Sequence, residues 1–116
     1  MSDLITAKRN EIQKLRQEIA ILERDIEELE LTEKYDVRFN IWYKTEDGEF
    51  FFRPRGIDNG RAVGLSINLR ENELAYELDD DTFGLENSFS QMQVSSYGEM
   101  LNAVNLHNLE ILEQYK

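Results

Sequence analysis

The sequence predicts an α+β protein made of an N-terminal coiled-coil helix, a four- to five-stranded antiparallel β-meander and a C-terminal helix. Residues 1–34 contain no aromatic residue, glycine or proline, whereas all twelve aromatic residues, all six glycines and the single proline come later. Hydrophobic residues recur at heptad spacing in the first part and at alternate positions in the second. We therefore expect a coiled-coil dimerisation helix at residues 1–34 and a globular head at residues 35–116.

The expected helix carries an isoleucine every seven residues from Ile5 to Ile26, with leucines three residues later. These are the a and d positions of a coiled coil, and Lys8 is the only polar d residue. The expected seam consists of Ile5, Ile12, Leu15, Ile19, Leu22, Ile26 and Leu29. So narrow a stripe predicts pairing with another coiled-coil chain. The alternative is that the stripe packs on the chain's own head.

Charges beside the seam bear on the choice of partner. In a parallel homodimer Glu18 would face Glu23, and both charges are negative. Asp25 would likewise face Glu30. An antiparallel homodimer would pair Arg9 with Glu30, but would bring Glu18 beside Asp25. Because each arrangement contains repulsion, the charges favour a different and more basic partner helix, although exposed pairs contribute little energy. Homodimer and heterodimer both stay open.

The head begins with an expected hairpin. Hydrophobic and polar residues alternate over residues 35–44, which predicts a first strand. Asp47-Gly48 predicts a two-residue turn in which both residues have positive φ. A turn centred there would pair Tyr43 with Phe52 on the core face.

The rest of the meander follows from proline, glycine and alternation signals. Its expected parts are a second strand ending at Pro54, a loop at 57–60, a third strand at 63–69, a turn at 70–73, a fourth strand at 74–78, an acidic loop at 79–87, and a short strand or helical piece at 88–94.

A capping box begins the closing helix, with Ser96 as N-cap and Glu99 reaching back to it. Apolar and amide residues then recur every three or four positions. The expected inward stripe is Tyr97, Leu101, Val104, Asn108, Ile111 and Tyr115.

Composition excludes several classes of protein. The chain has 116 residues, a net charge of −11 and no cysteine, so we expect one domain with an appendage and no thiol or cysteine–metal chemistry. No apolar run has the length of a membrane span or signal peptide, so we expect no membrane partner and an intracellular location. The negative charge argues against direct nucleic-acid binding.

The sequence offers no catalytic, metal or cofactor site that we would assign. His107 is the single histidine and is expected to be a satisfied or solvated helix residue. The run Asp79–Asp81 invites a calcium-loop interpretation, which fails because Phe83 and Ser90 stand where ligands are needed. We therefore expect no enzyme, no metal and no cofactor.

Three arginines interrupt the acidic head. Arg53, Arg55 and Arg61 lie within nine residues and could form an anion-binding pocket. The alternative is that they neutralise the acidic turns nearby. The expected hairpin also sets Arg53 beside Trp42, a cross-strand cation–π pair.

Three stretches of the head carry a resemblance: residues 50–58, residues 65–69 with 76–78, and residues 85–104. They resemble the RWD-type heads of coiled-coil kinetochore proteins, most closely the small paired subunits of the outer-kinetochore microtubule-binding complex. Arg53-Pro54-Arg55-Gly56 departs from that pattern in being longer and more basic. The resemblance implies an RWD-like fold, an obligate heterodimer at the kinetochore in the nucleus, and a head that receives a peptide helix.

These observations lead to one expected function and two alternatives. We expect a non-catalytic dimerisation and adaptor protein that pairs through its coil and offers its head to a protein or peptide. The first alternative is a small acidic inhibitor of phage type that mimics nucleic acid, and it would be cytoplasmic. The second is a head that binds a nucleotide or another anion through the arginines.

Overall fold

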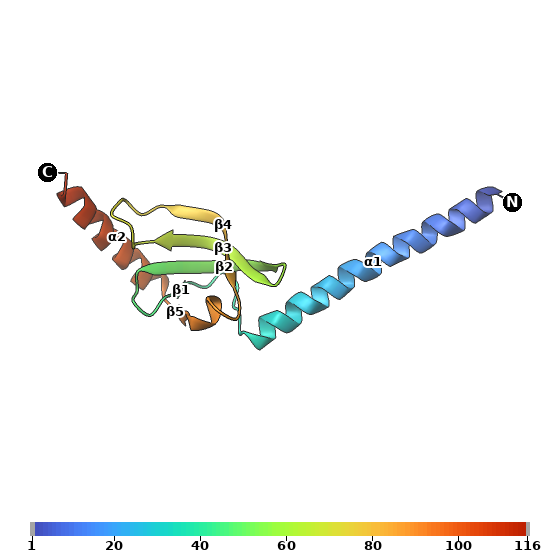
Figure 1. The fold of residues 1–116 in the computed structure, drawn as a ribbon, viewed down its shortest axis with the longest axis horizontal. Helices are drawn as coiled ribbons and strands as arrows, with labels where there is room; N and C mark the ends of the chain where they lie inside the picture. The colour runs from blue at the N-terminus through green and yellow to red at the C-terminus, as the bar shows by residue number, and fades with distance from the viewer. Residues whose placement is uncertain (1, 116) are drawn as a thin grey trace.

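The computed structural model describes residues 2–115 and shows a long helix that extends from a small α+β head (Figure 1). The elements are α1 (Ser2–Lys34), β1 (Tyr43–Lys44), β2 (Phe50–Asp58), β3 (Arg61–Asn68), β4 (Glu77–Gly84), the 3₁₀ helix η1 (Phe89–Gln91), β5 (Gln93–Val94) and α2 (Tyr97–Glu113). The molecule measures 81 × 30 × 22 Å because α1 projects away from the head. The predicted α+β class, with an N-terminal helix, an antiparallel sheet and a C-terminal helix, is confirmed.

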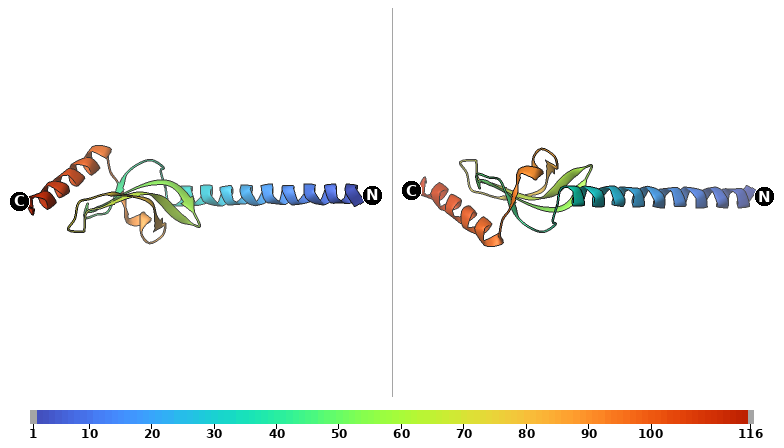
Figure 2. Two further views of the ribbon diagram at one scale, coloured as in Figure 1. Left: turned by 90° about the horizontal axis from the view of Figure 1, so that it is seen from above. Right: turned by 90° about the horizontal axis from the view of Figure 1, so that it is seen from below.

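The five strands lie in the order β4-β3-β2-β1-β5, each antiparallel to its neighbours. Both faces of the sheet are covered, and Figure 2 shows η1 and α2 on opposite sides. Phe52 belongs to one buried cluster together with Phe89 of η1. Its neighbour Phe51 belongs to the other, together with Trp42 and Met100 of α2. Successive residues of a strand point to opposite faces, so both phenylalanines are buried.

The expected strand over residues 35–44 is wrong, apart from its last two residues, which form β1. Asp36 and Asn40 have φ angles of +50° and +63°, which break the extended chain. Asp and Asn tolerate this left-handed conformation better than most residues. The backbone N–H of Arg38 donates to the hydroxyl of Tyr43 at 3.1 Å and closes the loop. The alternation of hydrophobic and polar residues therefore arises from the burial of Val37 and Tyr43 in the core, and it does not indicate a strand here.

The predicted register of the first hairpin is confirmed, because Tyr43 faces Phe52. Its turn differs from the prediction. The N–H of Gly48 donates to the carbonyl of Thr45 at 2.9 Å, and the N–H of Thr45 donates to the carbonyl of Phe50 at 3.0 Å. Gly48 has positive φ and Asp47 does not, so the connection is a longer loop with the same centre.

The prediction that Pro54 ends the second strand is wrong. Pro54 is buried within β2, which continues to Asp58. The register shifts by one residue at Arg55, and a bulge tolerates a residue that has no N–H to donate. The expected loop at 57–60 shrinks to Asn59-Gly60, with φ angles of +52° and +72°. This pair forms the tight β2–β3 turn that Asn-Gly favours.

The expected acidic loop at 79–87 is also wrong in its first half. Asp79–Asp81 lie within β4, whereas the segment expected to be the fourth strand contributes only Glu77 and Leu78. β4 is an edge strand, and charged residues with a bulge protect such an edge from pairing with other sheets. Asp80 is at that bulge, with a φ angle of +59°. Residues 88–94, for which strand and helix were both open, contain η1 and β5.

The closing helix is confirmed, and its buried face shares three residues with the predicted stripe. The side chains toward the sheet are Met100, Ala103, Val104, His107, Asn108 and Ile111. Tyr97, Leu101 and Tyr115, predicted to face inward, are exposed. Val104, Asn108 and Ile111 face the sheet as predicted, and the side chain of Asn108 accepts from the N–H of Ala75 at 2.8 Å.

Candidate protein-binding surfaces

The first candidate surface is the apolar stripe of α1. None of the residues Ser2–Lys34 is buried. The seven predicted seam residues are between 49% and 64% exposed: Ile5, Ile12, Leu15, Ile19, Leu22, Ile26 and Leu29. Exposed aliphatic side chains in a continuous stripe are unusual on a lone helix and mark an interaction face. The stripe does not pack on the head of its own chain.

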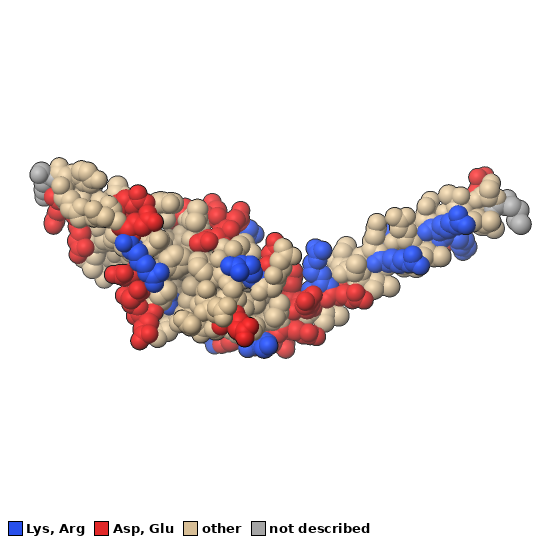
Figure 3. All heavy atoms as spheres, in the orientation of Figure 1, with Lys and Arg blue, Asp and Glu red and all other residues tan. Residues whose placement is uncertain are grey.

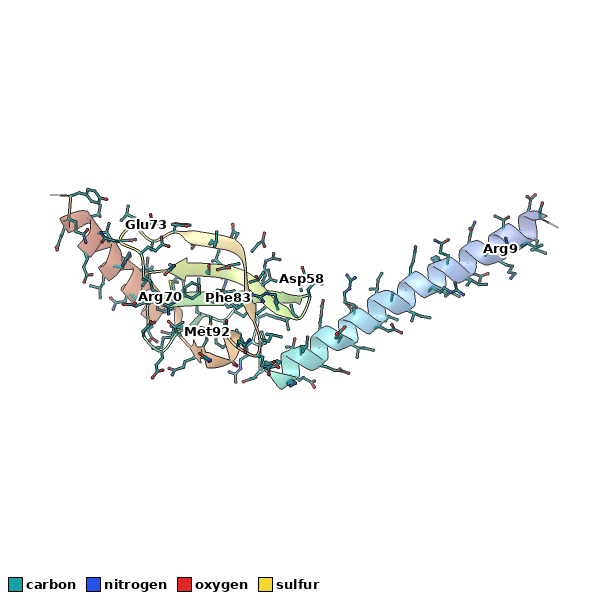
Figure 4. The ribbon with its side chains drawn as sticks, viewed as in Figure 1. Arg9, Asp58, Arg70, Glu73, Phe83 and Met92 are labelled. Carbon is teal, nitrogen blue, oxygen red and sulfur yellow. The ribbon has the colours of Figure 1, made fainter. Side chains whose placement is uncertain are left out.

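The head holds α1 from the side opposite this seam. Leu31 is an f position of the heptad and packs against the cluster around Phe52. A cavity of about 280 Å³ separates α1 from the β2–β3 turn. Its lining from α1 is Arg24, Glu27, Glu28 and Leu31, all at b, c or f positions, and Figure 4 shows Asp58 at the facing turn. The a and d positions are therefore left open up to Leu29.

The second candidate surface is a groove between the sheet and α2. It contains two cavities, of about 360 and 440 Å³, and Tyr76 lines both. Apolar lining residues are Trp42, Leu65, Ile67, Ala75, Met100, Leu101 and Val104 in the first and Leu74, Ile111, Leu112 and Tyr115 in the second. Tyr76 is 63% exposed and Tyr115 is 81% exposed, so large apolar groups stand in solvent around the groove.

Acidic residues accompany this groove. Glu77 lines the first cavity and Glu73 the second, and Arg53 is the basic residue in the first. A hydrogen bond and the charge of Glu71 raise the pKa of Glu73, because two carboxylates close together resist ionising together. An apolar ligand with basic groups would fit this combination.

Polar contacts fix α2 beside the sheet and so shape the groove. Ser96 caps the helix, and its hydroxyl accepts from the N–H of Glu99 at 3.1 Å, as predicted. The Glu99 carboxylate forms an ion pair with Lys44 of β1, which lowers the pKa of Glu99. At the other end His107 Nε2 lies 2.7 Å from the carbonyl oxygen of Glu73. The predicted structural role of His107 fits this contact.

The three arginines have separate partners. The Arg53 guanidinium lies over the Trp42 ring, 5.6 Å from its centre, as predicted. Arg55 forms an ion pair with Asp80, so the two bulge residues of β2 and β4 neutralise each other. Arg61 donates to the hydroxyl of Thr82 at 3.4 Å. The groove cavity includes Arg53 but neither Arg55 nor Arg61. This placement supports the neutralising interpretation for Arg55.

A further cavity of about 580 Å³ lies on the face opposite α2, and Figure 4 shows Arg70, Phe83 and Met92 around it. Asp47 and Arg70 also line it, 3.2 Å apart. Hydrogen bonds from Thr45, from the Glu49 N–H and from Arg70 lower the pKa of Asp47 to about 2. The charged groups thus satisfy each other, and the network stabilises the loop after β1. Within residues 2–115, no group of three acidic or histidine side chains is placed to hold a metal.

The sequence reasoning missed the outward face of α2. Leu106, Leu109 and Leu112 are each more than half exposed. The signal was present, since α2 carries more large apolar residues than the one face against the sheet can bury. Leu112 and Leu74 line the second cavity of the groove, near the C-terminal end of α2. The sequence pattern predicted no binding surface there.

Comparison with protein families, curated proteins and solved structures finds no match for this chain. Among residues 2–115, no helix combines the length and hydropathy that crossing a bilayer requires.

Proposed function

We propose that this protein is a non-catalytic dimerisation and adaptor protein, which assembles through the α1 seam and presents the groove of its head to a protein ligand. The observation that carries the proposal is the seam: seven aliphatic residues on one stripe, each about half exposed, on a helix that touches the head only at its end. Burying such a stripe against another helix removes apolar surface from water and drives assembly.

The head supports the second half of the proposal. Its groove joins aromatic and aliphatic side chains to a few acidic groups, which is the composition of a recognition surface for protein. The acidic residues Glu73 and Glu77 favour a ligand segment with lysine or arginine beside its apolar residues. Tyr76 lies where the two cavities meet and is the aromatic anchor of the surface.

Affinity purification of the tagged chain from its native source tests both halves. Ile12→Asp puts a charge into the seam and should lose the paired chain. Leu112→Asp alters the groove and should keep the paired chain while losing the head ligand. Ile21→Asp is the matched control, because Ile21 is 59% exposed but occupies a c position outside the seam. Recovery of the same proteins with all three variants would contradict the proposal.

The kinetochore role is a narrower form of this proposal and rests on the resemblance. An order of helix, meander and helix supports it, and it requires a different chain as partner. Recovery of a second, non-identical RWD-type subunit in the same purification would support it.

The acidic inhibitor is the second candidate, favoured by Asp79–Asp81 on the exposed edge strand β4. Salt-sensitive binding to a basic nuclease would support it, and Asp79→Asn with Asp81→Asn should then abolish that binding.

A further inference from the structure

We infer that the partner of α1 is a second copy of this chain and that the two helices run antiparallel. The inference rests on the proposed function, in which the α1 seam is the assembly element. It adds the identity and the direction of the partner helix. Four features of the described helix carry it: the segregation of charge, the place of Lys8, the match of seam layers and the point at which the head begins.

Charge is segregated along α1. Residues 1–17 contain four basic and two acidic residues, whereas residues 18–34 contain two basic and seven acidic residues. Figure 3 shows the basic groups along the outer half of the helix and acidic groups near the junction with the head. A parallel pair would set like halves together. An antiparallel pair sets the basic half of each copy against the acidic half of the other, which is complementary.

Lys8 gives the sharpest contrast between the two directions. It occupies a d position of the seam. In a parallel homodimer the two Lys8 ammonium groups face each other across the seam, and like charges there repel. In the antiparallel homodimer Lys8 lies level with Ile26 of the second copy. Asp25, at the g position beside that isoleucine, offers a carboxylate to the ammonium group.

The seam layers match in the antiparallel direction. When residue numbers in facing positions sum to about 34, each a residue faces a d residue of the other copy. Ile5 then faces Leu29, Ile12 faces Leu22, and Leu15 faces Ile19. Beside the seam, in this alignment, Arg9 lies nearest to Glu23 of the second copy, and the two Arg16 residues lie near each other. The acidic g positions also face one another, Glu18 with Glu18 and Glu11 with Asp25, so the antiparallel direction rests on the segregation of charge and on Lys8 and not on these flanking pairs.

The head leaves room for this partner. In this alignment Ser2 of the second copy lies level with Thr32, and α1 ends two residues later at Lys34. The described helix therefore overlaps its counterpart from Ser2 to Thr32. Leu31 holds the head from the f side, away from the seam. The two heads lie at opposite ends of the helix pair, separated by roughly 50 Å, so the dimer presents two grooves.

Cysteine cross-linking tests the direction, because the natural chain has no cysteine. Ile5→Cys and Leu29→Cys are oxidised separately and as an equimolar mixture, then analysed by non-reducing electrophoresis. We expect little covalent dimer from either variant alone and a prominent covalent dimer from the mixture. Cross-linking of Ile5→Cys with itself, at a yield equal to the mixture, would overturn the inference in favour of a parallel pair.

The mass of the untreated chain separates this inference from the proposed function. A natural chain that sediments as a monomer at tens of micromolar overturns the second copy as partner, and leaves assembly with another chain intact. A dimer that survives Ile12→Asp refutes the seam and thus the proposed function as well. Near-ultraviolet circular dichroism of each variant confirms that the head stays folded.

Discussion

The guanidinium of Arg53 lies over the indole of Trp42, with 5.6 Å between the guanidinium carbon and the ring centre. This contact joins β2 to the segment before it on the face that α2 covers. A cation–π pair between a buried indole and a partly exposed guanidinium contributes about 0.5–1 kcal/mol. A double-mutant cycle with Trp42→Leu and Arg53→Ala should therefore give a coupling free energy in that range.

Urea unfolding measures each corner of that cycle. Arg61→Ala with Trp42→Leu is the comparison pair, since Arg61 contacts Thr82 instead. Distant substitutions are usually additive, so its coupling should be about 0.5 kcal/mol or less. Equal coupling for the two pairs would show that the indole does not sense the Arg53 charge.

Gly64 leaves no room for a side chain. A β-carbon built there would overlap the carbonyl oxygen of Arg53 and lie 2.8 Å from the α-carbon of Pro54. Both obstacles are backbone of β2, which cannot move without breaking its pairing with β3. Gly64→Ala should lower the free energy of unfolding by about 3 kcal/mol.

Gly56→Ala is the matched control in the same strand pair, because a β-carbon at Gly56 meets nothing within 4 Å. Gly56→Ala should change the free energy of unfolding, measured in urea, by only about 0.5 kcal/mol. Similar losses for the two substitutions would mean that the close approach of β2 and β3 does not decide the stability.

Asp47 should make the stability depend on acidity. Hydrogen bonds from Thr45 and from the Glu49 N–H, with Arg70 beyond them, lower its pKa from 3.8 to about 2 in the folded protein. A carboxyl with a lowered folded pKa stabilises the protein above its unfolded pKa and loses that contribution as pH falls. The loss should therefore run from about 3.8 down to about 2.

The check is urea unfolding across that interval for the natural chain and for Asp47→Asn. The natural chain should lose free energy of unfolding more steeply than the variant as pH decreases. The asparagine keeps the shape of the side chain but does not titrate. Parallel curves would contradict the assignment of the low pKa to Asp47.

Part of this fold can be predicted from local pattern. The heptad in α1 and the Ser96 cap of α2 depend on residues close in sequence, and the structure has both elements. The Tyr43–Phe52 register followed from the centre of one turn. The turn signal of Asn59-Gly60 was equally strong but was interpreted as part of a loop, because Pro54 was taken to end the strand.

The remaining errors come from long-range contacts. Asp79–Asp81 resemble a solvated loop, and only pairing of β4 with β3 makes them an edge strand. Asn108 and Ala75 are far apart in sequence, and their hydrogen bond ties the predicted face of α2 to the segment before β4. The groove combines residues of α2 with residues of the sheet, so it could not be assigned as a site from the sequence. The seam residues of α1 could be listed from the sequence, because a heptad repeat depends only on residues close to one another in the chain.

The mass of the chain in solution tests the central claim, which is pairing through the α1 seam. Sedimentation equilibrium over a micromolar concentration series would compare the natural chain with Ile12→Asp and with the exposed control Ile21→Asp. The natural chain and the control should weigh twice 13.7 kDa. Ile12→Asp should weigh 13.7 kDa, with a dissociation constant raised by about 100-fold or more. A dimer of Ile12→Asp as stable as that of the natural chain would contradict the account.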